Sequence, residues 1–171
     1  ADLVIEAVVE EMEVKQRLFA QLDQVCKPET ILATNTASLS VTAIGADIPR
    51  KDRVIGMHFF NPVHSMKLLE IVIGAKTSQV TLDAVLKVAS RMGKEPITDR
   101  DTPGFATSRL GMVLGLEAMR MLEQGVASVD DIDKAMVLGY NHPMGPLHLT
   151  DLVGLEQQVV QRVRKGPHRA G

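Results

Sequence analysis

A histidine and a glutamate twelve residues apart, His58 and Glu70, are the residues of this sequence best suited to proton-transfer chemistry. A carboxylate beside an imidazole orients the ring and stabilises its protonated form, so such a pair can take a proton from a hydroxyl and return it. The alternative is a structural histidine whose ring is satisfied by a buried glutamate. The two residues alone leave both interpretations open.

The pair lies in two segments that are predicted to be buried strands. Residues 54–57 form an apolar, β-favouring run that ends at His58, and Asn61-Pro62 stops it because proline cannot donate to a strand ladder. Residues 68–73 form a second apolar run that contains Glu70. A lone acid in an apolar strand needs a partner, and the nearest candidate is His58, across a turn.

The segments before this stretch alternate between strand and helix patterns. Strands are predicted over residues 2–8 and 30–34, and a short helix from an N-cap at Ser40 to Gly45. A helix is predicted over residues 10–25, with an apolar face made by Val14, Leu18, Leu22 and Val25. Strand, helix, strand, helix, strand in this order predicts a parallel α/β sheet with right-handed crossovers.

After the second central strand the pattern becomes helical. We expect a helix over residues 80–92, with Val80 on its apolar face, that ends at Gly93, then a weak strand at residues 96–98. The turn at residues 101–104 is taken as the boundary between a domain of residues 1–100 and a domain of residues 101–171. The second domain is predicted to contain helices over residues 105–124 and 128–139, the second with Ser128 as its N-cap, then a last helical pattern that begins at Asp151, and a solvated basic tail over residues 162–171.

The composition excludes several classes of protein. The chain has 171 residues, 45% of them hydrophobic, and a net charge of −2, which argues against nucleic acid or an anionic membrane as the main partner. No apolar run approaches the roughly 18 residues that span a bilayer. The single Cys26 excludes an internal disulfide, is interpreted as a buried filler residue and indicates a reducing compartment, so a cytoplasmic protein is expected. No pattern of metal ligands is found.

Several polar residues follow the predicted parallel strands. Glu10 follows the first strand, Asn35 and Ser38 follow the second, and His58 with Asn61 follows the third. In a doubly wound sheet ligands bind outside the carboxyl ends of the strands, so these residues are expected at one rim. This convergence favours the functional interpretation of His58.

Five stretches carry a resemblance to a known family, in its order and spacing, from residue 1 to about residue 155. They are Asp2-Leu-Val-Ile-Glu-Ala-Val-Val-Glu10, Asn35-Thr-Ala-Ser-Leu39, His58-Phe-Phe-Asn-Pro62 with Glu70, Asp101-Thr-Pro-Gly-Phe105, and Gly139-Tyr-Asn-His-Pro-Met-Gly-Pro146. Together they closely resemble the 3-hydroxyacyl-CoA dehydrogenases, and among these the bacterial 3-hydroxybutyryl-CoA dehydrogenases. An unrelated β-hydroxyacid dehydrogenase is disfavoured, because those enzymes use a lysine base.

The resemblance implies a role for each site residue. His58 is the catalytic base for the 3-hydroxyl and Glu70 its orienting carboxylate. Four residues are implied to contact NAD and two the acyl-CoA substrate: Glu10, Lys15, Asn35 and Asn61 for NAD, and Ser38 and Ser108 for the substrate. The alternatives are a solvated Lys15 on a helix face and a Glu10 that is only a helix-start charge.

The sequence also departs from the family pattern. Ala37 stands where the family usually has a serine, and Ser108 where it usually has an asparagine. The family's glycine-rich GxGxxG turn is missing, so the chain is similar to the second half of a Rossmann-like NAD-binding domain followed by the first helices of an all-α C-terminal domain. We expect it to be incomplete at both ends and inactive alone, with homodimerisation of the full-length protein through the C-terminal helices. The alternative is a non-catalytic remnant that acts only as a binding or interaction module.

Overall fold

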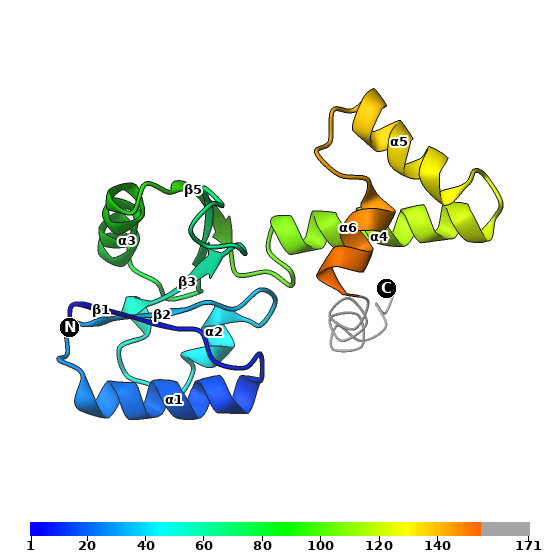
Figure 1. Ribbon diagram of the computed structural model, residues 1–171. Coiled ribbons are helices and arrows are strands. Elements are labelled where there is room, and N and C mark those ends of the chain that lie inside the picture. The colour runs from blue at the N-terminus through cyan, green and yellow to red at the C-terminus, as the bar shows by residue number, and fades with distance from the viewer. Residues whose placement is uncertain (155–171) are drawn as a thin grey trace. The chain divides into compact units, whose positions relative to one another are not determined.

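The computed structural model describes residues 1–154, which fall into two compact units that meet between Phe105 and Ala106. The first unit contains five strands, three α-helices and one short 3-10 helix (Figure 1). In chain order they are β1 (Leu3–Glu6), α1 (Met12–Val25), β2 (Ile31–Thr34), α2 (Val41–Ile44), η1 (Lys51–Arg53), β3 (Val54–Phe59), β4 (Leu68–Ile73), α3 (Gln79–Arg91) and β5 (Glu95–Arg100).

The five strands form one sheet in the order β1-β2-β3-β4-β5. The first three are parallel, as the alternation of strands and helices predicts, and β4 and β5 are parallel to each other. Strand β4 runs antiparallel to β3, so the sheet is mixed. This reversal follows from the short connection after β3, because parallel neighbours need a crossover of a dozen or more residues.

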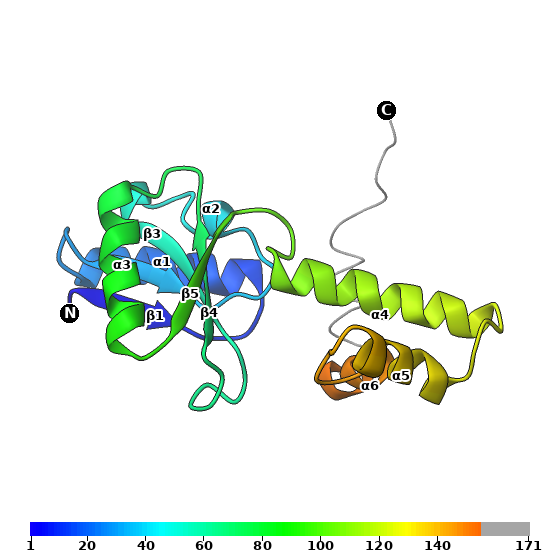
Figure 2. The same ribbon diagram turned by 90° about the horizontal axis from the view of Figure 1, so that it is seen from above.

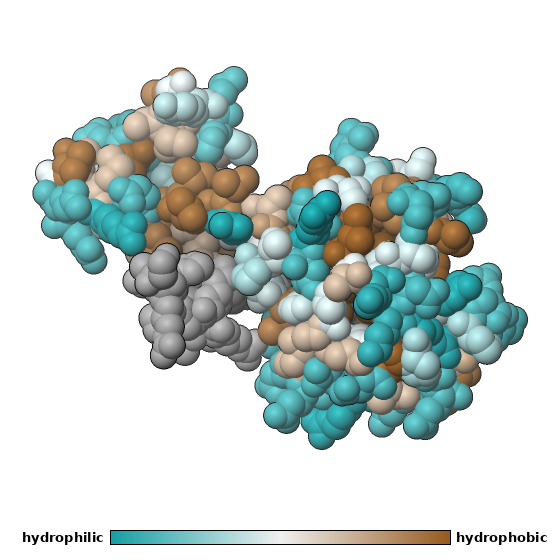
Figure 3. Space-filling model, turned by 180° about the vertical axis from the view of Figure 1, so that it is seen from behind, coloured by the Kyte–Doolittle hydropathy of each residue, from teal (hydrophilic) through white to brown (hydrophobic). Residues whose placement is uncertain are grey.

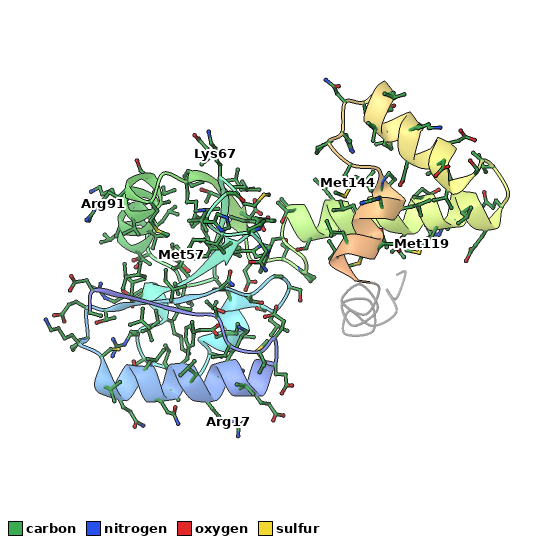
Figure 4. All side chains as sticks on the ribbon, in the orientation of Figure 1. Arg17, Met57, Lys67, Arg91, Met119 and Met144 are labelled. Atoms are coloured by element: carbon green, nitrogen blue, oxygen red, sulfur yellow. The ribbon has the colours of Figure 1, made fainter. Side chains whose placement is uncertain are left out.

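Helices cover both faces of this sheet (Figures 1 and 2). On one face Phe19 of α1 and the short helix α2 pack against Leu32 and Val54. On the other face Met57, labelled in Figure 4, packs with Val85 of α3. Successive strand residues point to opposite faces, so His58 and Glu70, at even positions in their strands with Val54 and Val72, point to the α1 and α2 face.

The buried face of α1 differs from the predicted one. Val25 is 80% exposed, whereas Lys15 and Phe19 are fully buried. The residues of α1 and its C-cap that face the core recur at the helical spacing Met12, Lys15, Phe19, Leu22, Cys26. Val80 is likewise exposed, although a place in the buried face of α3 was predicted for it. One position in the buried face of α1 is thus taken by a charged residue, Lys15. A search for apolar residues at helical spacing does not detect it.

The predicted ends of several helices are confirmed. Ser40 caps α2 by accepting a hydrogen bond from the Ala43 N–H, and Gly93, just after α3, has the positive φ of 68° expected at such a position. The carboxylate of Asp101, directly after β5, also accepts hydrogen bonds from the N–H groups of Val41 and Thr42 at the start of α2.

The second unit contains three helices among the described residues: α4 (Thr107–Glu123), α5 (Val129–Gly139) and α6 (Pro146–Val153). Ser128 caps α5, as predicted. The last helix begins at Pro146 rather than Asp151, because proline suits the first helical position and Asp133 of α5 accepts hydrogen bonds from the N–H groups of Leu147 and His148. Gly154 ends this helix instead of extending it.

The core of the second unit is small, consisting of Ala118, Ile132 and Leu147 with a few partly buried neighbours. Many apolar side chains of the described helices are exposed, and Figure 3 shows apolar surface on this unit. They include Leu110, Val113, Leu114, Leu122, Val129, Leu138, Leu149, Leu152 and Val153. No helix of the described residues is long and apolar enough to cross a membrane. The predicted basic tail, residues 162–171, lies outside the described residues.

Candidate functional site

The predicted pair of His58 and Glu70 is formed in the structure. The two residues are direct partners in the antiparallel register of β3 and β4, and His58 Nδ1 lies 2.7 Å from Glu70 Oε2. The Glu70 side chain is fully buried, whereas the His58 side chain keeps 10% of its surface exposed. Because Nδ1 is held by the carboxylate, Nε2 is the nitrogen left for a ligand.

Two aromatic rings flank the imidazole. The ring centroids of His58 and Phe60 are 4.5 Å apart, and those of His58 and Phe105 are 6.2 Å apart. Phe105 is itself buried, with a positive φ of 49°. These apolar rings fix the plane of the imidazole from its sides, while Glu70 fixes its rotation.

A second buried ion pair lies at the carboxyl end of β1. The Lys15 ammonium donates to both oxygens of Glu6, at 2.9 and 3.0 Å, and neither side chain is more than 2% exposed. Glu6 also accepts hydrogen bonds from the Thr34 hydroxyl of β2 and from the Val8 N–H. Lys15 is therefore not solvated on a helix face. Its charge is balanced by a carboxylate inside the first unit.

Glu10 joins this ion pair to the loop after β2. Its Oε2 lies 3.5 Å from the Lys15 ammonium, while Oε1 accepts hydrogen bonds from the Thr36 hydroxyl and from the N–H groups of Ala37 and Ser38, at 2.5, 3.0 and 3.2 Å. Its side chain remains 37% exposed. Glu10 is thus more than a helix-start charge, because it organises the neighbouring loop at the rim of the sheet.

Asn35 connects this loop to the strand that carries His58. Its side-chain Oδ1 accepts a hydrogen bond of 2.8 Å from the N–H of Phe59, the residue after His58. Asn61 is exposed in the loop that follows β3. The carboxyl ends of β1, β2 and β3 therefore bring Glu10, Asn35 and His58 to one rim, as the parallel order of these strands implies.

The two predicted substrate residues lie in different units. Ser38 is half-buried at the rim, in the loop that Glu10 holds. Ser108 is half-buried in the first turn of α4, in the second unit. The structure describes each within its own unit.

Sequence reasoning missed three residues of this site. Glu6 and Thr34 complete the surroundings of Lys15, and Phe105 packs near the imidazole. A signal existed for Glu6, since a carboxylate ends an otherwise apolar strand just as Glu70 interrupts one. Phe105 ends one of the five stretches that carry the family resemblance, but no role was assigned to it there, and nothing in the sequence pattern indicated Thr34.

Among the described residues, neither a cavity elsewhere in the first unit nor a metal site offers an alternative to the rim as the functional site. A cavity of about 210 Å³ is lined by Val41, Val54 and Thr77, at the end of β3 far from His58. Within residues 1–154 no group of His, Cys, Asp or Glu side chains could hold a metal ion.

Comparison with known proteins agrees with this arrangement. Residues 1–102 match the family model of the NAD binding domain of 3-hydroxyacyl-CoA dehydrogenase, and residues 104–168 that of its C-terminal domain. Over 155 residues the chain is 51% identical to a 3-hydroxybutyryl-CoA dehydrogenase of Clostridioides difficile, covering 91% of this chain and 55% of that protein. Over 155 residues it is 48% identical to the mitochondrial hydroxyacyl-coenzyme A dehydrogenase of Sus scrofa, covering 91% and 49%.

A solved structure shows the same similarity in three dimensions. The crystal structure of (S)-3-hydroxybutyryl-CoA dehydrogenase from Ralstonia eutropha superimposes with a TM-score of 0.89 at 43% identity, covering 94% of this chain and 56% of that one. The chain spans about half the length of the curated relatives it matches.

Proposed function

Because this chain belongs to the 3-hydroxyacyl-CoA dehydrogenase family, we propose that it supplies the proton-transfer half of an NAD-dependent oxidoreductase that interconverts (S)-3-hydroxyacyl-CoA and 3-oxoacyl-CoA. The single observation that supports this most is the His58–Glu70 pair, with Nδ1 and Oε2 2.7 Å apart and the ring reaching solvent at the rim. A short-chain substrate, 3-hydroxybutyryl-CoA, is favoured by the names of the bacterial relatives.

His58 performs the proton chemistry in this proposal. Its Nε2 takes the proton of the 3-hydroxyl while the hydride departs from C3, which leaves the 3-oxo product and an imidazolium. Glu70, fully buried, stabilises that imidazolium and holds the ring rotation. In the reductive direction the imidazolium returns the proton to the alkoxide oxygen.

The described residues fit one part of NAD. NAD, when bound, accepts or supplies the hydride. Glu10 and Asn61, both exposed to some degree at the rim, suit the hydroxyls and amide of a nicotinamide riboside, and Asn35, which follows β2, is the third residue of this group. No Gly-x-Gly occurs in the sequence, so the pyrophosphate lacks the glycine turn it needs within these residues. Lys15, the fourth residue that the family resemblance assigns to NAD, is fully buried, and its ammonium lies 3.5 Å from Glu10 Oε2.

Ser38 and Ser108 are proposed to contact the acyl-CoA. Ser38 lies at the same rim as His58, in the loop held by Glu10. Ala37 offers no hydroxyl there, and the Thr36 hydroxyl donates to Glu10, so Ser38 is proposed to supply the hydroxyl of this loop. Ser108 opens α4, and its part in substrate binding rests on the family resemblance.

The proposal extends to the assembly, location and partners of the whole protein. The exposed apolar side chains of the helical unit suit a homodimer interface in the whole protein. We place the activity in the cytoplasm, in fatty-acid β-oxidation or butanoate metabolism, with acyl-CoA as the partner and neither nucleic acid nor membrane. The competing possibility, a binding module without redox chemistry, does not account for a histidine held this way at the rim.

The experiment that tests this function uses a chimera as well as the chain itself. Residues 1–155 of this chain replace the matching segment of the Clostridioides difficile relative, which is 55% of the length of that protein. We expect the chimera to oxidise 3-hydroxybutyryl-CoA with NAD, and the 171-residue chain alone to bind NAD weakly or not at all in calorimetry. A folded chimera without activity would contradict the proposed function, and micromolar NAD binding by the chain alone would contradict the assignment of the pyrophosphate site.

A further inference from the structure

The segment that follows β5, residues 101–105, is fixed to the first unit at both of its ends. At its start the Asp101 carboxylate accepts hydrogen bonds from the Ser40 hydroxyl and from two N–H groups at the start of α2, at 2.7, 3.1 and 2.8 Å. At its end Phe105 is 2% exposed and belongs to the core cluster on the α1 and α2 face of the sheet. All of these contacts lie within the first unit.

The backbone of this segment turns sharply just before Phe105. The Thr102 carbonyl accepts a hydrogen bond of 3.0 Å from the Phe105 N–H, which closes a turn with Pro103 and Gly104 at its central positions. Gly104 has a φ of 77°, as the third position of a type II turn requires. Phe105 also has a positive φ, 49°, which is strained for a bulky side chain. The contacts around Phe105 must therefore hold it in a backbone conformation that the residue itself does not favour.

The Phe105 ring lies beside the imidazole of the proposed base. The two ring centroids are 6.2 Å apart, and the ring planes are tilted by 58°. Phe60, the other ring beside His58, is half-buried and comes from the same strand connection, directly after β3. Phe105 is almost fully buried and comes from beyond β4, α3 and β5. Of the two rings, Phe105 is thus the one whose place depends on contacts far from the strand of His58.

From this geometry we propose that Phe105 and Asp101 are positioning residues for His58: Asp101 fixes the segment on α2, and the fixed segment holds the Phe105 ring beside the imidazole. The ring limits the tilt of the imidazole and the access of water to its hydrogen bond with Glu70. The inference rests on the proposed function only for its effect on turnover, while its effect on the imidazole stands on the contacts alone.

A role in core packing alone predicts a different result from a positioning role. If Phe105 only fills the core, a large-to-small change elsewhere in the same cluster should disturb His58 equally. Phe19 of α1 offers the comparison, because it is fully buried in that cluster, whereas the rings that flank the imidazole are Phe60 and Phe105. Core packing and ring position can therefore be separated by the same substitution at two places.

The test measures proton exchange with water in the 171-residue chain by nuclear magnetic resonance. The first readout is the proton between His58 Nδ1 and Glu70 Oε2, assigned by its loss in His58→Gln. The second is the N–H of Ile55 in β3, which reports on the stability of the sheet. The ratio of the two exchange rates isolates the imidazole from the fold as a whole.

Three variants are compared with the parent chain. Phe105→Leu removes the ring, and Asp101→Ala removes the anchor but leaves the core residues in place. Phe19→Leu is the matched control, the same substitution at a buried position of the same cluster. If Phe105→Leu does not fold, Asp101→Ala decides the test alone.

We expect the Nδ1 proton of His58 to exchange about tenfold faster, relative to the Ile55 N–H, in Phe105→Leu and in Asp101→Ala, because the ring no longer covers the hydrogen bond. The double variant should match Phe105→Leu, since both changes act through the same ring. Phe19→Leu should lose stability but keep the ratio of the parent.

Two results would show that Phe105 is only a core residue. One is an unchanged ratio in Phe105→Leu, and the other is an equal rise in Phe19→Leu. An unchanged ratio in Asp101→Ala would overturn the role of the anchor. A Nδ1 proton that already exchanges too fast to observe in the parent would mean that no ring shields it, and would also contradict the proposal.

A kinetic measurement on the chimera extends the test to function. Phe105→Leu should lower the kcat for 3-hydroxybutyryl-CoA oxidation about tenfold and change the KM for the acyl-CoA less than about twofold, because the geometry of proton transfer is altered rather than binding. Phe19→Leu should keep kcat within about twofold of the parent. A raised KM with an unchanged kcat in Phe105→Leu would contradict the positioning role. An inactive parent chimera would count against the proposed function instead, with the exchange result still deciding the positioning role.

Discussion

The first unit contains two buried pairs of a basic side chain and a carboxylate, and the pairs differ in one respect. In both, a nitrogen of the basic side chain and a carboxylate oxygen lie within 3 Å, on the same face of the sheet, and in both the carboxylate is almost fully buried. The His58 side chain, however, keeps 10% of its surface exposed, whereas Lys15 keeps none. A group must reach its ligand to exchange a proton with it. Access to the rim thus separates the pair that can exchange a proton from the pair whose charge is balanced inside the unit.

The two pairs are also connected differently to their surroundings. His58 has one carboxylate partner and two aromatic neighbours. Lys15 touches two carboxylates and a carbonyl, and through them two loops. We therefore expect changes at the first pair to affect turnover, and changes at the second to affect stability and loop order.

The largest effect is expected from His58→Gln in the chimera. The kcat for 3-hydroxybutyryl-CoA oxidation should fall by about 10²–10⁴-fold, the usual contribution of a general base, while acyl-CoA affinity stays close to that of the parent. Steady-state kinetics with calorimetric acyl-CoA binding measures both. His64→Gln, at an exposed histidine six residues along the same connection, is the control and should leave kcat unchanged. If His58→Gln keeps the kcat of the parent chimera, the His58–Glu70 pair has only a structural role.

The next effect is on stability, at the other pair. Lys15→Met should lower the free energy of unfolding by roughly 3–5 kcal/mol, because the Glu6 charge is left buried without its cation. His58→Gln should cost less, because a glutamine side chain can still donate to Glu70. Urea denaturation of the 171-residue chain and both variants, followed by circular dichroism, gives the ranking. If both variants lose the same free energy of unfolding, the two pairs do not differ in their effect on stability.

These pairs also show what the sequence could predict. The pairing of His58 with Glu70 followed from an acid inside an apolar run, and the strands β2, β3 and β4 and the caps Ser40 and Ser128 followed from local patterns. Hydrophobic patterning counts only apolar residues, so it could not place Lys15 in the buried face of α1. It correctly placed Leu22 there, but also Val25, which is exposed.

What the sequence could not indicate depended on contacts between distant residues. The partner of Lys15 is nine residues upstream in another element, and the residue that caps α6 is Asp133 of α5. Partners such as these become visible only when the chain has folded, because no local periodicity links them. The predicted start of α6 was also wrong. The Pro/Gly-rich segment before residue 151 was interpreted as a loop, although Pro146 suits the first position of a helix.

A smaller effect than that of His58→Gln is expected from Glu70→Gln. The neutral side chain still holds the ring by a hydrogen bond but no longer stabilises the imidazolium, so kcat should fall by about 10–100-fold. The double variant His58→Gln/Glu70→Gln should be little worse than His58→Gln alone, because the two residues act as one unit. Glu95→Gln, an exposed acid in the neighbouring strand β5, is the control. Losses that multiply in the double variant would mean that Glu70 acts independently of the histidine.

The smallest effect is expected at Asn35, the residue that connects the Lys15 loop to the His58 strand. Its Oδ1 is the acceptor for the Phe59 N–H, at 2.8 Å. Asn35→Ala removes this acceptor and should cost about 1 kcal/mol of stability, the usual effect of one lost hydrogen bond, with a severalfold lower kcat/KM in the chimera. Asn35→Asp retains an oxygen at the same place and should keep the stability of the parent, although the lost amide can still change NAD binding. Denaturation of both variants, with hydrogen exchange at the Phe59 amide, measures the difference. If Asn35→Ala leaves the Phe59 amide as protected as in the parent, the loop and the catalytic strand are not joined here, and the two ion pairs act independently.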